Sequence, residues 1–148
     1  MHIRPAEDQD VSRIAEILVF NNRVNYWPIF KDDAYSFGKL TVLAVAEEYQ
    51  ENHRKPGCIF VYDDGIIKGF VHVEDGEIRK LYVDTFFQGN GIGAALLDYA
   101  VSEHSAKYLW ALEKNVRALS FYQKHGFHLT GDRTYEEGTT EWLVKLER

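Results

Sequence analysis

Apolar residues recur at two spacings along the chain, and the spacing changes from helical to strand-like near residue 58. Val11, Ile14, Ala15 and Leu18 follow the spacing of an amphipathic helix that Asp8 or Asp10 could cap. Later, strand-like runs are separated by the short turns Asp63-Asp64-Gly65 and Glu74-Asp75-Gly76. Turns this short join antiparallel neighbours. The pattern therefore predicts a three-stranded meander over Cys58–Tyr62, Ile66–Val73 and Glu77–Val83.

The same patterns predict the other elements. Helices are expected over Lys39–Tyr49, Ile92–His104 and 115–125, and strands over Met1–Arg4, Lys107–Leu112, Phe127–Tyr135 and Thr139–Leu146. The aromatic segment 21–37 is expected to be irregular because Pro28 breaks a continuous helix, and 50–57 is expected to be a loop. Because a helix separates strands 77–83 and 107–112, these two strands are expected to be parallel.

Composition narrows the class of protein. The length of 148 residues predicts one domain over residues 1–148. Seventeen basic against 23 acidic residues give a net charge of −6, which disfavours binding to nucleic acid or anionic membranes. Cys58 is the sole cysteine, and its apolar neighbours predict a buried thiol. With no long apolar stretch and a polar start, the chain is expected to be cytoplasmic, as a monomer or a homodimer.

A glycine-rich loop stands between the strand at Leu81–Val83 and the helix that begins at Ile92. Its sequence from residue 88 is Gln-Gly-Asn-Gly-Ile-Gly. Glycines let the backbone approach a ligand closely, and the first N–H groups of a helix have no internal partner. The loop therefore predicts a phosphate-binding site, and hence a phosphorylated cofactor.

Two motifs carry a family resemblance. Gln88, Gly91 and Gly93 fit the pattern Gln/Arg-x-x-Gly-x-Gly/Ala, and a later block combines Asn115, Phe121-Tyr122 and Gly126-Phe127. Together they resemble the GNAT superfamily of acyl-CoA-dependent N-acetyltransferases, in particular its small bacterial members. The resemblance implies an α+β fold with a three-layer arrangement. Its sheet is mixed, mostly antiparallel and seven-stranded, with helices on both faces and a V-shaped splay between strands 4 and 5.

The resemblance also implies a cofactor site for acetyl-CoA. Main-chain N–H groups of the loop would bind the pyrophosphate, from residues Gln88, Gly89, Asn90, Gly91, Ile92, Gly93 and Ala94. The backbone of Leu81, Tyr82 and Val83 would bond to the pantetheine arm. Asn115 would contact the same arm, although it could also serve as a simple helix cap. No metal is implied, and His125 and His128 lack the partner set of a metal site.

Tyr122 matches the family tyrosine that protonates the departing coenzyme A sulfur. A phenol with a pKa of about 10 stays protonated at neutral pH, and the leaving thiol titrates near 8.5. The alternative is a core tyrosine beside Phe121.

The general base is less well defined. Period-two alternation places Glu77, Arg79, Leu81 and Val83 on one face of their strand. Related enzymes often carry a glutamate where this chain has Arg79, and some carry one where it has Trp110. Glu77, acting through water, and His72 on the adjacent strand are the candidates, and both could instead be structural.

The acceptor amine is expected to bind between the segment 21–37 and the closing hairpin. Tyr26, Trp27, Phe30 and Tyr135 could form an aromatic wall, and the carboxylates Asp32, Asp33, Glu136 and Glu137 could attract a cationic amine. Such aromatic residues are also common in cores, and such carboxylates are commonly solvated.

The sequence thus predicts acetyl transfer from acetyl-CoA to a primary amine by direct attack. The amine would be a protein or peptide N-terminus, a lysine or a small amine. One alternative is a non-catalytic acyl-CoA sensor. A second is a dinucleotide-binding domain, since Gly89-x-Gly91-x-x-Ala94 fits a relaxed fingerprint with Glu113 as the ribose ligand. The short turns before the loop argue against the dinucleotide alternative.

Overall fold

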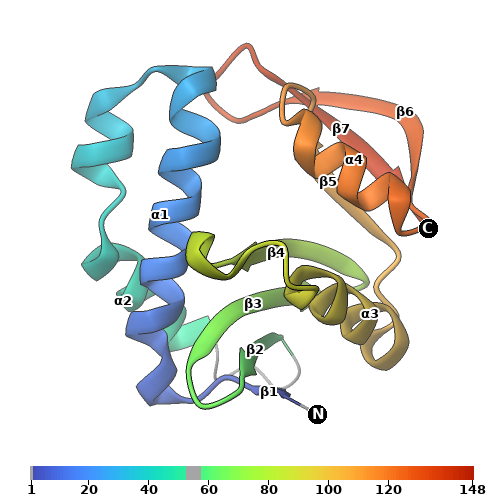
Figure 1. The fold of residues 1–148 in the computed structure, drawn as a ribbon. Helices are drawn as coiled ribbons and strands as arrows, with labels where there is room; N and C mark the ends of the chain where they lie inside the picture. Colours follow the sequence, from blue (N-terminus) through green and yellow to red (C-terminus); the bar gives the residue numbers. More distant parts are fainter. Residues whose placement is uncertain (1, 53–57) are drawn as a thin grey trace.

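The computed structural model describes residues 2–52 and 58–148, and its centre is one seven-stranded sheet (Figure 1). The strand order is β1-β2-β3-β4-β5-β7-β6, and every neighbouring pair is antiparallel except the parallel pair β4 and β5. The strands span β1 (Ile3–Pro5), β2 (Ile59–Asp63), β3 (Ile67–Glu74), β4 (Glu77–Val83), β5 (Tyr108–Leu112), β6 (His128–Tyr135) and β7 (Trp142–Glu147). The predicted mixed sheet and its meander are confirmed.

Helices cover both faces of the sheet. They are α1 (Val11–Phe30), α2 (Val42–Asn52), α3 (Ile92–His104) and α4 (Val116–Lys124), with short turns at η1 (Asp8–Asp10), η2 (Ala34–Lys39) and η3 (Thr85–Phe87). Alternate strand residues enter two separate cores. Val61 and Phe70 pack with α1 and α2, whereas Phe60 and Val71 pack with α3 and α4. This two-sided burial confirms the predicted α+β arrangement.

The prediction for the segment after Asn21 was wrong. Helix α1 continues through Pro28 to Phe30 and ends at Lys31, which has a left-handed φ of 55°. Pro28 lies in the last turn, where its missing N–H costs the single hydrogen bond to the Val24 carbonyl, and the helix ends two residues later. Helix α2 begins three residues later than predicted because the Thr41 hydroxyl caps it, accepting from the Ala44 N–H at 3.2 Å. Helix α2 also includes residues 50–52 of the predicted loop, and residues 53–57 lie outside the described residues.

A bulge in β4 contradicts the predicted regular alternation of side chains between the two faces of this strand. His72 pairs with Lys80, but Val73 pairs with Ile78, so Arg79 is an extra residue in the ladder. Opposed residues share a face, and one inserted residue reverses the alternation. Ile78 therefore shares its face with Leu81 and Val83 and packs toward α3 and α4. Glu77, opposite Glu74, lies on the other face together with Lys80.

The sheet is nearly divided at its centre. Strands β4 and β5 share a single register pair, Glu77 with Tyr108, whereas β5 pairs with β7 along all five of its residues. The two strands therefore meet at one end and leave a gap beyond it, as the predicted splay requires. Antiparallel pairing of β2, β3 and β4 excludes the βαβ units of a dinucleotide fold.

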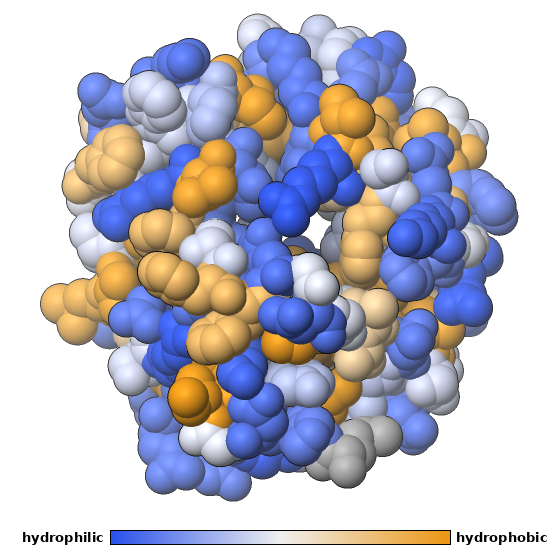
Figure 2. All heavy atoms as spheres, in the orientation of Figure 1, coloured by the Kyte–Doolittle hydropathy of each residue, from blue (hydrophilic) through white to orange (hydrophobic). Residues whose placement is uncertain are grey.

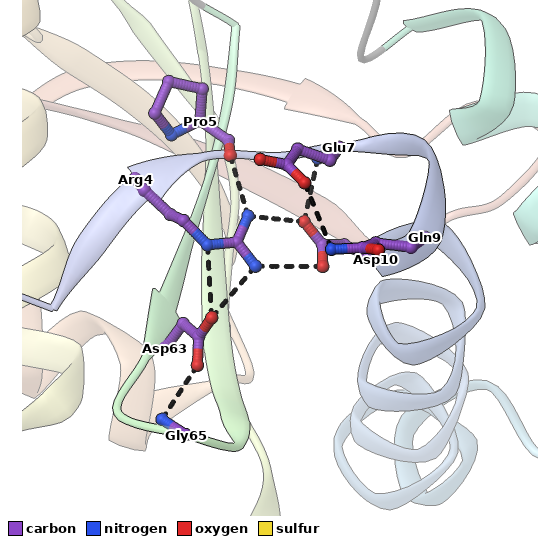
Figure 3. A network of polar contacts seen from close by, with 7 residues as sticks. All are labelled: Arg4, Pro5, Glu7, Gln9, Asp10, Asp63 and Gly65. Atoms are coloured by element: carbon purple, nitrogen blue, oxygen red, sulfur yellow. Dashed lines mark hydrogen bonds and ion pairs between the residues drawn. The ribbon is translucent and has the colours of Figure 1, made fainter.

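Arg4 joins the first strand to the rest of the molecule (Figure 3). Its guanidinium donates to both carboxylate oxygens of Asp10, at 2.7 and 3.1 Å, and to Asp63 at 3.0 and 3.2 Å. Asp10 is buried and also accepts from the Glu7 N–H, so its charge is fully compensated. Asp10 thus precedes α1 as predicted, but its carboxylate binds Arg4 instead of capping the helix.

Cys58 is buried, as predicted. Within residues 2–52 and 58–148, no helix combines the length and the apolar character that crossing a membrane would need. The same residues contain no cluster of three or more His, Cys, Asp or Glu side chains suited to a metal ion.

Candidate active site

A cleft of about 570 Å³ lies in the gap between β4 and β5. Figure 2, drawn in the orientation of Figure 1, shows an opening near the middle of the molecule. Strand β4 lines the cleft with residues 78–83 and β5 with residues 109–112, while the glycine loop, the start of α3 and one side of α4 complete it. This size is typical of a small-molecule site.

The glycine loop turns into α3 at the edge of the cleft. Gly89 and Gly91 have φ angles of 83° and 82°, and Gly91 is the N-cap of α3. A side chain at either position would meet open space, so the left-handed backbone, not crowding, favours glycine there. The first α3 hydrogen bond to the cap runs from Ala95 N–H to the Gly91 carbonyl, which leaves the preceding N–H groups of the helix without helical partners. Every predicted loop residue except Asn90 lines the cleft.

Asn21 fixes the loop to helix α1, and sequence reasoning missed it. Its buried side-chain N–H group donates to the carbonyls of Ile17 and Val83, at 2.9 and 3.0 Å. The Gln88 side chain donates to the same Val83 carbonyl at 3.1 Å and to the Asn21 oxygen at 3.3 Å. The end of β4 and the start of the loop are therefore held together by one buried asparagine. A polar residue on the otherwise apolar face of the α1 sequence was the available signal.

Asn115 lies at the other side of the cleft, where α4 begins. Its side-chain oxygen accepts from the Ala118 N–H at 3.3 Å, so the predicted cap is present. Asn115 also lines the cleft. One residue therefore combines the two alternatives that its sequence position left open, a cap and a place in the site.

Three tyrosines from separate elements line the cleft: Tyr26 from α1, Tyr82 from β4 and Tyr122 from α4. Burial raises the pKa of Tyr122 above its ordinary value, with a smaller contribution from Tyr26. Burial likewise raises the pKa of Tyr82, whose hydroxyl lies 3.4 Å from that of Tyr26. All three side chains are neutral phenols at physiological pH, so they can donate protons.

The two candidate bases do not line the cleft. Glu77 forms an ion pair with Arg79 at 3.4 Å, on the face of β4 that the bulge turns away from Leu81. His72 is buried with its Nε2 3.4 Å from a Glu74 carboxylate oxygen, and burial lowers its pKa. Among the residues that the structure describes, none of those that line the cleft is Asp or Glu. Tyr122 and the loop are thus brought together, whereas Glu77 and His72 stand outside the cleft.

Apart from the undescribed residues 1 and 53–57, the Asp, Glu, Lys and Arg side chains that line the cleft are all basic. They are Arg79, Lys80, Arg117 and Lys124, in a chain whose net charge is −6. This local reversal of charge suits an anionic ligand. Arg117 had no assigned role in the sequence analysis, although it lies inside the Asn115 to Phe127 block.

A second, shallower groove lies between the end of α1 and the β6–β7 hairpin. Phe30 and Tyr135 line it, together with the carboxylates of Asp32, Glu136, Glu137 and Glu141. The ring of Tyr26 packs edge-on against Phe30 with centroids 6.5 Å apart, so α1 connects the groove to the cleft. Of the four predicted acceptor residues, Tyr26 lines the cleft and two line the groove. Trp27 lines neither and donates to Asp33 at 2.7 Å.

Comparison with known proteins agrees with the family resemblance of the sequence motifs. Residues 55–129 match the model of the acetyltransferase (GNAT) domain. The chain is 35% identical over 85 residues to the peptidyl-lysine N-acetyltransferase YiaC of Escherichia coli, a match that covers 55% of this chain and 58% of that protein. It is 24% identical over 151 residues to a spermine/spermidine N(1)-acetyltransferase of Bacillus subtilis, covering 89% and 90% of the two chains. The chain therefore spans less than two thirds of the length of YiaC.

Solved structures share the fold over its whole extent. The PaiA N-acetyltransferase from Thermoplasma acidophilum, determined in complex with coenzyme A, superposes with a TM-score of 0.75 at 17% identity. That superposition covers 99% of this chain and 98% of the other. The chain belongs to the GNAT family of acetyltransferases.

Proposed function

We propose that this chain is an N-acetyltransferase that moves an acetyl group from acetyl-CoA to a primary amine by direct attack. The observation that carries the proposal is the cleft between β4 and β5, which joins a glycine loop with free N–H groups to a buried tyrosine and, within residues 2–52 and 58–148, has four Lys or Arg and no Asp or Glu side chains in its lining. An anionic nucleotide with a thioester arm is the ligand that matches this combination.

The donor would bind along the open edges of the divided sheet. The free N–H groups at the start of α3 would bind the diphosphate, and the main chain of Leu81, Tyr82 and Val83 would bond to the pantetheine arm. The cap at Asn115 uses only the side-chain oxygen, and within the described residues its NH2 group makes no hydrogen bond. That donor is the part of Asn115 available to the arm.

Acyl transfer would then proceed in one step. The amine nitrogen attacks the thioester carbonyl carbon, a C–N bond forms, and the C–S bond breaks with its electron pair on sulfur. The Tyr122 hydroxyl would protonate that sulfur, and the proton lost by the amine would restore the phenol through solvent. Cys58 supports direct attack because it is buried against α1 and α2 and does not line the cleft, so it cannot carry an acetyl group there.

The amine would lose its proton without a carboxylate in contact. Among the described residues no Asp or Glu lines the cleft, and its histidine, His125, packs against the ring of Phe121, so deprotonation is assigned to water or to the fraction of amine that is already neutral. An α-amine with a pKa of about 8 has an appreciable neutral fraction at pH 7, whereas a lysine at about 10.4 does not. N-terminal and small amines are therefore favoured as acceptors.

The acceptor would reach the thioester from the acidic groove and would itself be cationic. The groove is lined by four carboxylates, and Tyr26 lies between it and the cleft. Separation of a basic donor side from an acidic acceptor side would guide oppositely charged substrates to their own entrances. A peptidyl-lysine and a polyamine acetyltransferase are among the relatives, and both named acceptors are cationic.

A screen of acceptors tests the proposal. The protein is incubated with acetyl-CoA and single amines, namely peptides with free N-termini, lysine peptides blocked at the N-terminus, and polyamines, and release of coenzyme A is followed by thiol detection. Acetylated product from at least one cationic amine is expected. Binding of acetyl-CoA without turnover of any amine would instead support the non-catalytic sensor, for which the lack of a carboxylate base in the cleft is the favouring observation.

A further inference from the structure

Arg117 connects two sides of the cleft. It stands in the first turn of α4, and its Nη2 donates to the side-chain oxygen of Gln88 at 3.1 Å. Gln88 is the first residue of the glycine loop on the opposite side of the cleft, where it also donates to Val83 and Asn21. The guanidinium is therefore held at the loop that has free N–H groups.

The partner of Arg117 is neutral. Arg4, Arg13, Arg79 and Arg133 each have a carboxylate within 4 Å, but among the described residues no carboxylate lies that close to Arg117. A neutral amide gives a weaker hydrogen bond than an anion would. Arg117 thus has an unneutralised charge in a chain that has an excess of acidic residues.

The positive charge of Arg117 does not stabilise helix α4. The N-terminus of a helix carries a partial positive charge, so a cation in the first turn is disfavoured. The first turn of α4 holds no acidic residue that would offset it. The arginine is also exposed, so packing does not account for it either.

We propose that Arg117 binds the diphosphate of the coenzyme A group, which it reaches by exchanging its bond to Gln88 for one to the phosphate. Arginine presents two parallel N–H groups that match two phosphate oxygens. Gln88 stays in place after the exchange because Val83 and Asn21 still hold its amide. This inference rests on the proposed function for the identity of the ligand, and it adds a binding residue outside the glycine loop.

The test measures binding of coenzyme A and of dephospho-coenzyme A, which lacks the 3′-phosphate, by titration calorimetry. R117Q is expected to raise the Kd of both ligands by the same factor, about tenfold, because a hydrogen bond to a charged group is lost. R117K, which keeps the charge but loses the paired donors, is expected to fall between R117Q and the native protein. The matched control is K114Q, since Lys114 lies just before the same helix, pairs with Glu141 and does not line the cleft.

The outcomes separate this inference from the proposed function. Unchanged affinity in R117Q overturns the role of Arg117, and so does an equal loss in K114Q, which would indicate a general effect of charge. A loss confined to coenzyme A and absent with dephospho-coenzyme A overturns the diphosphate assignment. Failure of the native protein to bind coenzyme A overturns the proposed function itself. Thermal unfolding of R117Q at or above the native temperature is expected, because removing this cation relieves its conflict with the helix dipole.

Discussion

The hydroxyl of Tyr26 lies 3.4 Å from the hydroxyl of Tyr82, at the point where helix α1 meets the end of β4. The buried Tyr122 faces the same cleft from α4. Burial raises the pKa of Tyr82 and Tyr122, so these phenols hold their protons, and no carboxylate of the described part of the chain lines the cleft. The proposed protonation of the leaving sulfur by Tyr122 works against this raised pKa and therefore depends on direct contact, with removal of the amine proton left to solvent.

The change Tyr122→Phe tests the proton donor. We expect kcat to fall by roughly 10²- to 10³-fold, a loss typical of a removed general acid, with little change in the Kd of acetyl-CoA. Tyr99→Phe is the matched control, because Tyr99 lies on α3, has its ring tilted against that of Phe60 at a centroid distance of 5.1 Å, and does not line the cleft. Steady-state kinetics and calorimetry give the two quantities. Equal kcat in the two variants would remove Tyr122 from the reaction.

The pH dependence of kcat/KM should follow the ionisation of the acceptor amine and not that of Tyr122. The neutral amine is the nucleophile, so kcat/KM should rise up to about pH 8 for an α-amine and continue rising beyond pH 9 for a lysine. Because the pKa of Tyr122 is raised, the phenol stays protonated at pH values above its ordinary pKa of about 10. No decline in kcat/KM is therefore expected below about pH 10. Initial rates with one acceptor of each kind measure this difference. A decline near pH 8 in both profiles would contradict it.

Alkaline pH should destabilise the fold. A phenol whose folded-state pKa is raised contributes stability that is fully present below the unfolded-state value of about 10 and is lost as the pH rises through the folded-state value. Tyr49, Tyr82 and Tyr122 all have pKa values raised mainly by burial. We expect the urea midpoint to drop between about pH 10 and 11.5, with part of the tyrosinate absorbance appearing only on unfolding. Full ionisation of all tyrosines near pH 10 in the folded protein would be inconsistent with this burial.

The negative charge of the acidic groove should lower the KM for a cationic acceptor amine. Replacing Glu136 and Glu137 by Gln removes two carboxylates from the lining of the groove. We expect KM for a cationic amine to rise severalfold, with less effect at high salt because exposed charges are screened. KM for acetyl-CoA should stay the same. The control is Glu103→Gln on the exposed side of α3, and an unchanged acceptor KM in the double variant would argue against entry through the groove.

Gly69 is a test of packing at the sheet centre. A Cβ atom there would lie 2.9 Å from the Tyr82 carbonyl oxygen and 3.1 Å from a Leu96 methyl carbon, and the first of these is backbone that cannot rotate away. We expect Gly69→Ala to destabilise the protein by roughly 1–3 kcal/mol, the usual range for overpacking. Gly38→Ala is the control, since no atom lies within 4 Å of its added Cβ. Urea unfolding of both variants measures the difference, and equal midpoints would show that β4 can shift without cost.

Local chemistry made much of the fold predictable. The hairpin between β3 and β4 follows from Asp75 and Gly76, which both adopt the left-handed φ that such tight turns need. The cap at Asn115 and the left-handed exit at Gly126 likewise depend on side chains close in sequence. These features could be predicted because the interactions that determine them span only a few residues.

The features that sequence reasoning missed depend on distant partners. The buried Asn21 side chain on α1 donates to the Val83 carbonyl, which is 62 positions away in the sequence. The bulge at Arg79 is defined by pairing with β3, so alternation within β4 alone assigned Glu77 to the wrong face. No local pattern contains that information.

The near-division of the sheet also bears on self-association. Beyond the Glu77 and Tyr108 pair, β4 and β5 present unpaired backbone edges inside the molecule, and such edges can recruit a strand from another chain. The bulge at Arg79 and the charge on Lys80 make this edge irregular and cationic, which disfavours pairing with a copy of itself. A pantetheine arm laid between the strands would cover the same backbone groups. Saturation with cofactor is therefore expected to slow aggregation during heating, independently of any turnover.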